Sequence, residues 1–165
     1  LAGTTVTGIT QGITEADQFR LTASVTANAD ITANLERCDN ASFGKIGNGM
    51  SVSSGIFTFP STGTYQVISA ATFNGNGTIE AAMTLQTFVT TNNSSYDQVV
   101  EIQNGAQTTS NILVSASKSC FVNVTNTSNV KVKFTADSLS SGSSVIGDTD
   151  KNKTFFTFIR LGDST

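Results

Sequence analysis

Hydrophobic and polar residues alternate with a period of two along most of this chain, which is the pattern of half-buried β-strands. The clearest case is residues 130–135, where Val130, Val132 and Phe134 are interrupted by two lysines and a threonine. We expect this strand to have one dry face and one wet face. Similar patterns predict strands at residues 19–25, 31–35, 56–60, 65–71, 79–89, 96–104, 112–124 and 154–161.

Two of the predicted connections carry hairpin signals. Phe57 and Phe59 precede Pro60, the only proline, which lacks a backbone donor and ends its strand, and residues 61–63 (Ser-Thr-Gly) provide the turn. Residues 74–77 contain two Asn-Gly pairs, the strongest short-range hairpin signal in the sequence. We therefore expect a hairpin at each position.

The strand at 154–161 differs from the others because it is apolar on both faces (Thr-Phe-Phe-Thr-Phe-Ile-Arg-Leu). Such a strand is expected to lie centrally in a sheet and to be covered on each side. The Ser/Gly-rich stretch before it, residues 138–147, has no strand pattern and is expected to be a loop.

Residues 1–18 are rich in Gly and Thr and repeat Gly-Ile-Thr, without a period that would fill a core. We interpret them as an extended N-terminal arm, serving as attachment or linker, in front of a domain at 19–165. Val6, Ile9 and Ile13 are its candidate attachment residues, since isolated apolar side chains on an extended segment can dock into a partner surface. A disordered terminus explains the same composition equally well.

Composition supports this assignment to one β-domain. The chain has 165 residues, enough for one core, and only 13 % of them are charged. Thr, Ser, Asn and Gly take the place of the charged residues and favour strands and turns over helices. Short strands with Asn-Gly turns and no helical stretch predict an all-β fold, an antiparallel β-sandwich of jelly-roll type.

Charge and hydropathy exclude two classes of partner. The net charge is −3 and the pI about 4.7, so there is no basic surface for nucleic acid. No apolar run approaches the roughly 20 residues of a membrane span. We therefore expect neither a nucleic-acid nor a membrane partner.

Catalytic chemistry is also disfavoured. The chain contains no histidine, which removes the usual nucleophile pairs and the common zinc sites. Its carboxylates are expected at turns or on wet strand faces, as solvated surface. Residues 148–152 resemble half of a calcium loop, but Lys153 stands where that loop needs glycine. We predict no catalytic residue, cofactor or metal site, and Cys38 and Cys120 are either paired or two separate small apolar residues.

The residues around Pro60 resemble a family signature. Phe57, Phe59, Pro60, Gly63 and Tyr65 form Phe-x-Phe-Pro-x-x-Gly-x-Tyr, similar to the trimeric jelly rolls of the tumour-necrosis-factor and complement C-one-q superfamily. That superfamily closes with Thr-x-Phe-x-Gly-x-Leu-Leu, which is similar to the Thr, Phe and Leu at positions 154, 156 and 161 here. Phe158 replaces the glycine, so Phe156 and Phe158 complete the fold signature. The resemblance implies a homotrimer.

Residues 17–60, including Leu35-Glu36-Arg37 and Phe43-Gly44-Lys45-Ile46-Gly47, look still more like uncharacterised proteins of marine bacteriophages. This resemblance, over about 15–162, implies a non-enzymatic virion protein on the surface of the particle, as capsid decoration or fibre component. Its partners would be itself and other virion proteins, such as major capsid or fibre proteins.

Two other functions fit the same scaffold. A receptor-binding module of a phage fibre would bind a host surface polysaccharide, because loops with Asn, Thr and Tyr can hydrogen-bond sugars. The third hypothesis is that the protein is a secreted ligand of the complement C-one-q type.

Overall fold

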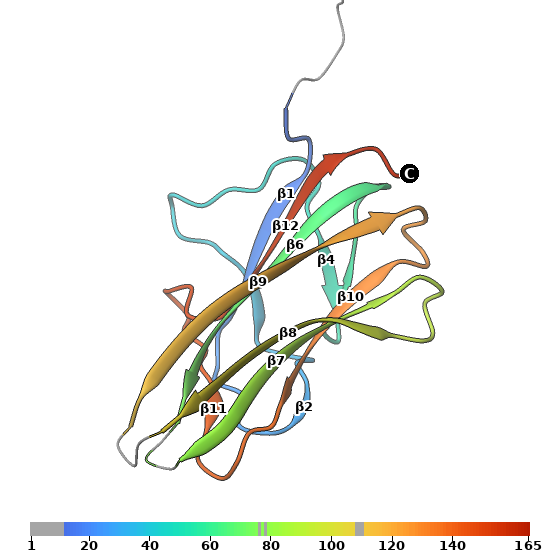
Figure 1. The fold of residues 1–165 in the computed structure, drawn as a ribbon. Helices are drawn as coiled ribbons and strands as arrows, with labels where there is room; N and C mark the ends of the chain where they lie inside the picture. Colours follow the sequence, from blue (N-terminus) through green and yellow to red (C-terminus); the bar gives the residue numbers. More distant parts are fainter. Residues whose placement is uncertain (1–11, 76, 78, 108–110) are drawn as a thin grey trace, which may run out of the picture.

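Two antiparallel β-sheets face each other as a sandwich in this computed structural model, which describes residues 12–75, 77, 79–107 and 111–165 (Figure 1). All regular secondary structure in these residues is β. In chain order the strands are β1 (Ala16–Leu21), β2 (Ala29–Asp30), β3 (Leu35–Arg37), β4 (Ser51–Ser53), β5 (Ile56–Thr58), β6 (Gly63–Asn74), β7 (Glu80–Thr90), β8 (Asp97–Ala106), β9 (Leu113–Val124), β10 (Lys131–Asp137), β11 (Ser144–Val145) and β12 (Phe155–Gly162). The expected all-β antiparallel sandwich is confirmed.

The strands alternate between the two sheets along much of the chain. Sheet A runs β9-β6-β12-β1-β3, with β11 paired to the end of β6. Sheet B runs β8-β7-β10-β5-β4, with β2 paired to β10. The start of β1 pairs with the end of β12, so the N-terminal and C-terminal strands are neighbours inside sheet A.

The core between the sheets is dominated by aromatic rings. Phe134 of sheet B stacks on Phe156 of sheet A, with ring centroids 3.7 Å apart. Phe57 lies 5.2 Å from Phe19 in an edge-to-face arrangement, and Phe59 lies 4.7 Å from Tyr65. The sandwich is therefore held by contacts between residues far apart in the sequence, as expected of a jelly roll.

The segment around Pro60 is not a hairpin. β5 pairs with β4 and β10 in sheet B, whereas β6 pairs with β12 and β9 in sheet A. Residues 59–62 therefore cross from one sheet to the other. The physical reason is Phe59, which is fully buried between the sheets and cannot lie on a surface turn.

The connection at the Asn-Gly pairs also differs from its prediction. β6 ends at Asn74 in sheet A, and β7 begins at Glu80 in sheet B, where it pairs with β8 and β10. Asn-Gly favours a tight reversal, but such a reversal does not require the two flanking strands to pair with each other.

β12 occupies the expected central position, between β1 and β6. One face is covered, because Phe156 and Phe158 are buried in the core. The other face is covered only in part by the described residues, because Phe155 and Ile159 are half-buried. Within the described residues, the expected cover is therefore complete on the core side of β12 and partial on its outer side.

Two further segments test the pattern. At β10 the predicted dry face is confirmed, since Val130, which precedes the strand, and Val132 and Phe134 within it are all buried. The expected loop at 138–147, in contrast, contains β11, which pairs with β6 and buries Val145 completely. Two paired residues are too few to produce a recognisable alternation.

Candidate functional site

The outer face of sheet A carries a group of outward-facing apolar side chains. Gln66 of β6 lies between Phe121 of β9 and Ile159 of β12, and the row of Ala70 passes through Phe155 to Arg20 of β1. The members of this surface, which we call the sheet A face, are Ile68, Ala70, Phe121, Phe155 and Ile159. Phe121 is 71 % exposed, which is unusual for a phenylalanine in the middle of a folded strand.

This face is hollowed on both sides of β12. A hollow of about 390 Å³ is floored by Ala70, Ser115 and Ser117 and walled by Phe155. A smaller one of about 210 Å³ lies where Phe43 approaches Ile159. Because small residues lie beside protruding rings, the sheet A face is uneven and can interlock with a second protein surface of complementary shape.

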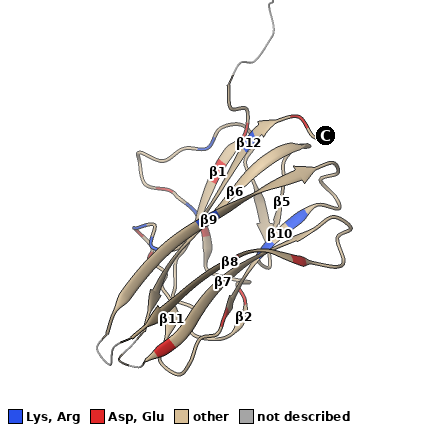
Figure 2. Ribbon diagram, in the orientation of Figure 1, with Lys and Arg blue, Asp and Glu red and all other residues tan. Residues whose placement is uncertain are grey.

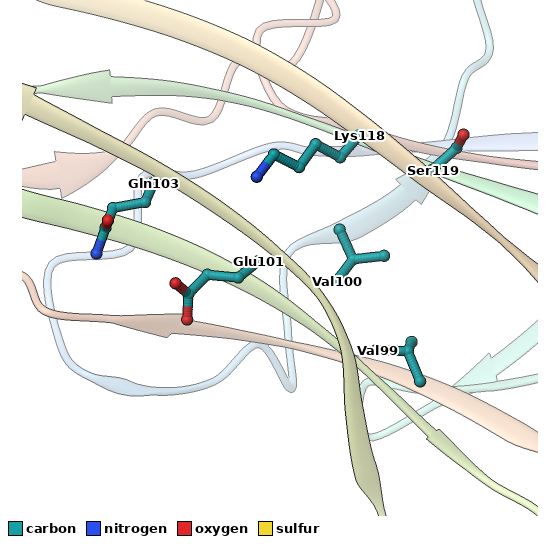
Figure 3. Close-up of a pocket in the computed structure, with 6 residues that line it drawn as sticks. All are labelled: Val99, Val100, Glu101, Gln103, Lys118 and Ser119. Carbon is teal, nitrogen blue, oxygen red and sulfur yellow. The ribbon is translucent and has the colours of Figure 1, made fainter.

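A third cavity, of about 500 Å³, lies at the open side of the sandwich, where β8 of sheet B runs beside β9 of sheet A (Figure 3). Val99, Glu101 and Gln103 line it from β8, and Lys118 and Ser119 from β9. Glu101 Oε2 accepts hydrogen bonds from Gln98 Nε2 at 2.9 Å and from Gln86 Nε2 at 3.5 Å. Lys118 and Ser119 are adjacent in β9 and therefore point to opposite faces of that strand, and no hydrogen bond joins the Ser119 hydroxyl to Lys118 or Glu101 in the described residues.

Charged groups are scattered over the sandwich (Figure 2). Within the described residues, no three His, Cys, Asp or Glu side chains are grouped so that they could hold a metal ion. The described part of the chain also contains no helix long and apolar enough to cross a membrane.

Three carboxylates depart from the expectation of solvated surface, because Glu15, Asp17 and Glu80 are buried. Glu15 and Asp17 accept hydrogen bonds from the backbone N–H groups of Gly49 and Met50, at 3.0 and 2.7 Å. They thereby fix the loop before β4 against β1. A buried carboxylate is stable only when hydrogen-bond donors surround it. The backbone donors of this loop therefore explain why Glu15 and Asp17 are buried, without a catalytic role.

Arginines complete the same region. The Arg37 guanidinium binds both oxygens of Asp17, and this hydrogen bonding raises the pKa of Arg37. Arg20 is buried among Glu36, Asp39 and Asn40. Burial lowers the pKa of Arg20, but its hydrogen bond to Asp39 and the neighbouring acidic charges outweigh this, so the pKa is raised overall. These ion pairs and hydrogen bonds hold β1 and β3 together at this edge of sheet A.

In the loop that resembled half of a calcium site, the carboxylate of Asp148 is bound by groups of the loop itself. Asp148 Oδ1 accepts the backbone N–H of Asp150 and of Lys151, and Asp148 Oδ2 pairs with Lys153 Nζ at 3.1 Å. The hydrogen bond from Asp150 and the contact with Lys153 lower the pKa of Asp148 to about 2. The aspartate therefore caps a turn.

The two cysteines are separate. Cys38 follows β3, at one edge of sheet A, and Cys120 lies in β9 at the opposite edge, and both are free thiols. With neighbouring strands about 4.8 Å apart, they are too distant for a disulfide. Burial raises the pKa of both thiols, and Cys38 Sγ also donates to Asn152 Oδ1 at 3.2 Å.

The residues of the sequence signature lie together in and around the core. Phe57, Phe59, Tyr65, Phe156 and Phe158 are all buried. The Tyr65 hydroxyl donates to Ser61 O at 3.1 Å, so it holds the crossing that contains Pro60. A Cβ on Gly63, whose φ is +149°, would collide with the Arg160 side chain and lie 2.7 Å from Gly162 O. These residues are structural.

The predicted attachment residues are only partly described. Val6 and Ile9 lie outside the described residues. Ile13 is 42 % exposed, and the chain joins sheet A at Ala16, so the last three residues of the predicted arm belong to β1.

Solved structures share this architecture, although their sequences differ strongly. An Eiger TNF from S. frugiperda superimposes with a TM-score of 0.68 at 12 % identity, covering 93 % of this chain and 96 % of that one. Murine APRIL reaches 0.65 at 10 % identity, over 89 % and 98 % of the two chains. The PRD1 vertex protein P5 reaches 0.56 at 16 % identity, over 92 % and 99 %. The fold is a TNF-like jelly roll.

No family model matches the sequence, and no curated protein matches it either. At these identities the structural likeness shows the TNF-like fold alone, so function has to be argued from the surfaces of this chain.

The sheet A face was only partly foreseen from sequence. The two-sided apolar pattern of β12 indicated it, but Phe121 was not singled out. The signal was present, because Phe121 stands between Cys120 and Val122, whose side chains point to the core face of β9. The buried Glu15 and Asp17 had no comparable signal, since their partners are backbone groups of a distant loop.

Proposed function

We propose that this chain is a non-enzymatic structural protein of a bacteriophage virion, a homotrimeric jelly roll displayed on the particle surface as capsid decoration or fibre component. The observation that carries the proposal is the sheet A face. Its exposed Phe121, half-buried Phe155 and Ile159 and adjoining hollows form an apolar surface that the described residues leave partly uncovered.

A second copy of the chain is the cover we infer. The TNF-like fold, the likeness to a phage vertex protein and the low charge of this face all support self-association. A stable interface buries roughly 800 Å² on each partner, which a face five strands wide can provide. The other virion partners would be reached through the N-terminal arm with Val6, Ile9 and Ile13.

The direct test is composition and mass. Peptides of this chain should be found by mass spectrometry in purified particles, and antibodies against the domain should label intact particles. The isolated protein should sediment at three times the 17.2 kDa of one chain at micromolar concentration. A stable monomer would contradict the trimer, and absence from purified particles would contradict the virion assignment.

The secreted-ligand alternative loses one of its supports. A bridge between Cys38 and Cys120 would have favoured an extracellular signalling protein, but the two thiols lie at opposite edges of sheet A. The polysaccharide alternative, in contrast, gains a specific surface, which lies on the other sheet.

A further inference from the structure

Two aromatic rings lie on the outer face of sheet B around a fixed ammonium group. Lys133 of β10 is the register partner of Phe88 of β7, so both side chains point outward from the same face. Lys133 Nζ lies 5.5 Å from the Phe88 ring centroid and 4.9 Å from that of Tyr96. It also pairs with Asp30 at 2.7 Å. The lysine thus holds both rings in place.

The loop that presents Tyr96 is fixed as well. Asn92 Oδ1 accepts the backbone N–H groups of Ser94 and Ser95, each at 2.9 Å. The N–H of Asn93, which has a φ of +56°, donates to Asn129 O at 2.9 Å and ties the loop to the turn before β10. A ligand of Tyr96 would therefore meet a ring that is already ordered, with little entropy left to lose.

Hydrogen-bonding groups surround the rings. Gln98 of β8 is the register partner of Phe88. Gln86 stands two residues before Phe88 in β7 and therefore points to the same outer face. Both donate to Glu101 Oε2, which orients their amides. In the described part of the chain nothing donates to either glutamine carbonyl, and Tyr96 Oη makes no hydrogen bond. Oriented amides and a hydroxyl beside a ring offer acceptors and donors at fixed positions.

This combination matches the chemistry of a sugar ring. A pyranose has an apolar face of C–H groups, which packs on an aromatic ring, and an equatorial rim of hydroxyls, which amides and carboxylates bind. Both lysines on this face are already engaged: Lys131 donates to Thr58 and Thr127, and Lys133 pairs with Asp30. With Glu101 and Asp137 also present, the face is unsuited to an acidic glycan or to nucleic acid.

We propose that the outer face of sheet B, at Tyr96, Phe88 and Gln98, binds a neutral oligosaccharide. This surface lies on the sheet opposite to the sheet A face, so occupancy of one does not require a change at the other. The binding function is separate from virion assembly and holds or fails independently of it.

The test is a panel of neutral hexose and N-acetylhexosamine oligosaccharides beside sialylated and uronic-acid-containing ones, applied to the full chain. The protein has no tryptophan and two tyrosines, of which Tyr65 is buried, so a change in tyrosine fluorescence reports Tyr96. We expect Tyr96→Ala to weaken binding of a retained neutral glycan by about tenfold or more and Tyr96→Phe to weaken it less.

Phe43→Ala serves as the control, because Phe43 is an exposed aromatic that lies against sheet A, and it should bind as the parent does. Sedimentation and melting of the same samples separate loss of binding from loss of assembly or folding. Retention of acidic glycans only, absence of any neutral ligand on the panel, or equal binding by folded Tyr96→Ala would each overturn the proposal.

Discussion

Phe57 of β5 and Phe158 of β12 lie with their ring centroids 5.0 Å apart, although the two strands belong to opposite sheets. Phe57 also packs against Phe19 and Phe134, so one side chain joins four strands. The short β5 thus contributes more to the core than its length suggests.

Truncation of Phe57 should therefore be severe. We expect Phe57→Ala, and likewise Phe59→Ala, to lower the free energy of unfolding by roughly 3–5 kcal/mol, because each leaves a cavity among rings that cannot collapse around it. Denaturant melts measure this loss. Ile56→Ala in the same strand is the control, since Ile56 is 37 % exposed, and it should change stability little. Parent-like melts of both phenylalanine variants would contradict the packing described here.

Gly63 allows a close approach that no other residue permits. A Cβ there would meet Arg160 and Gly162 O at a φ of +149°, so Gly63→Ala should cost roughly 1–3 kcal/mol through strain and displacement of Arg160. Gly162→Ala is the matched control, because a Cβ at Gly162 meets nothing within 4 Å. Thermal melts of the two variants should differ clearly. Equal melting would show that Arg160 yields without cost.

Local patterns predicted the strands better than their partners. The alternation at residues 130–135 defined the buried face of β10, because burial on one side of a sheet acts on each residue separately. The crossings at Pro60 and at the Asn-Gly pairs were interpreted as hairpins, since a turn signal describes only the reversal of the chain. Which sheet the next strand enters depends on core contacts such as Phe59 with Tyr65.

The surfaces were harder to predict than the fold. Phe88 and Tyr96 meet at Lys133, which lies more than thirty residues away along the chain: strand register brings Lys133 beside Phe88, and the loop before β8 brings Tyr96 to the same place. Asp17 and Arg37 pair across β1 and β3 in the same way. Such clusters can be recognised only once the order and register of the strands are known. The period-two pattern of a single strand therefore contains no signal for them.

The sheet A face should determine the oligomeric state. We expect Phe121→Ser to convert the assembly to single chains, because a 71 % exposed ring contributes little to the monomer but much to an interface that covers it. Sedimentation measures the change in mass, and melting of the variant should show a folded domain. Phe88→Ser on the opposite sheet is the control and should keep the parent mass. An unchanged mass in Phe121→Ser would place the interface elsewhere.

Asp148 gives a defined dependence on pH. Its folded pKa of about 2 lies below the ordinary value of 3.8, so its interactions stabilise the fold fully above about pH 4 and are lost as the pH falls through about 2. The difference in melting temperature between the parent and Asp148→Asn should therefore shrink between pH 5 and pH 2. Asp150→Asn, whose carboxylate makes no hydrogen bond within the described residues, should show no such trend. A constant difference for Asp148→Asn would contradict the turn-capping role.

The N-terminal arm supplies the last prediction, which concerns attachment to the particle. Glu15 O accepts the N–H of Arg160 and Ala16 bridges to Ile46, so the fold needs the chain from about residue 15 onward. Deleting residues 1–11 should leave the melting behaviour and the number of chains in the assembly unchanged. The deleted protein should nevertheless fail to co-sediment with particles, because Val6 and Ile9 would no longer dock by strand addition or groove binding.

Substitution separates the side chains of the arm from its backbone. In the full chain, Val6→Ser with Ile9→Ser should weaken attachment, whereas Thr4→Ser with Thr7→Ser, which keeps the length and polarity of the arm, should not. Three arms on one trimer raise the effective concentration, so avidity can gain roughly 10²–10⁴ over a single arm. A monomeric Phe121→Ser protein should for that reason attach weakly even with its arms intact. If the protein lacking residues 1–11 still joins the particle, attachment runs through the sandwich itself, and loss of folding would instead make the arm part of the core.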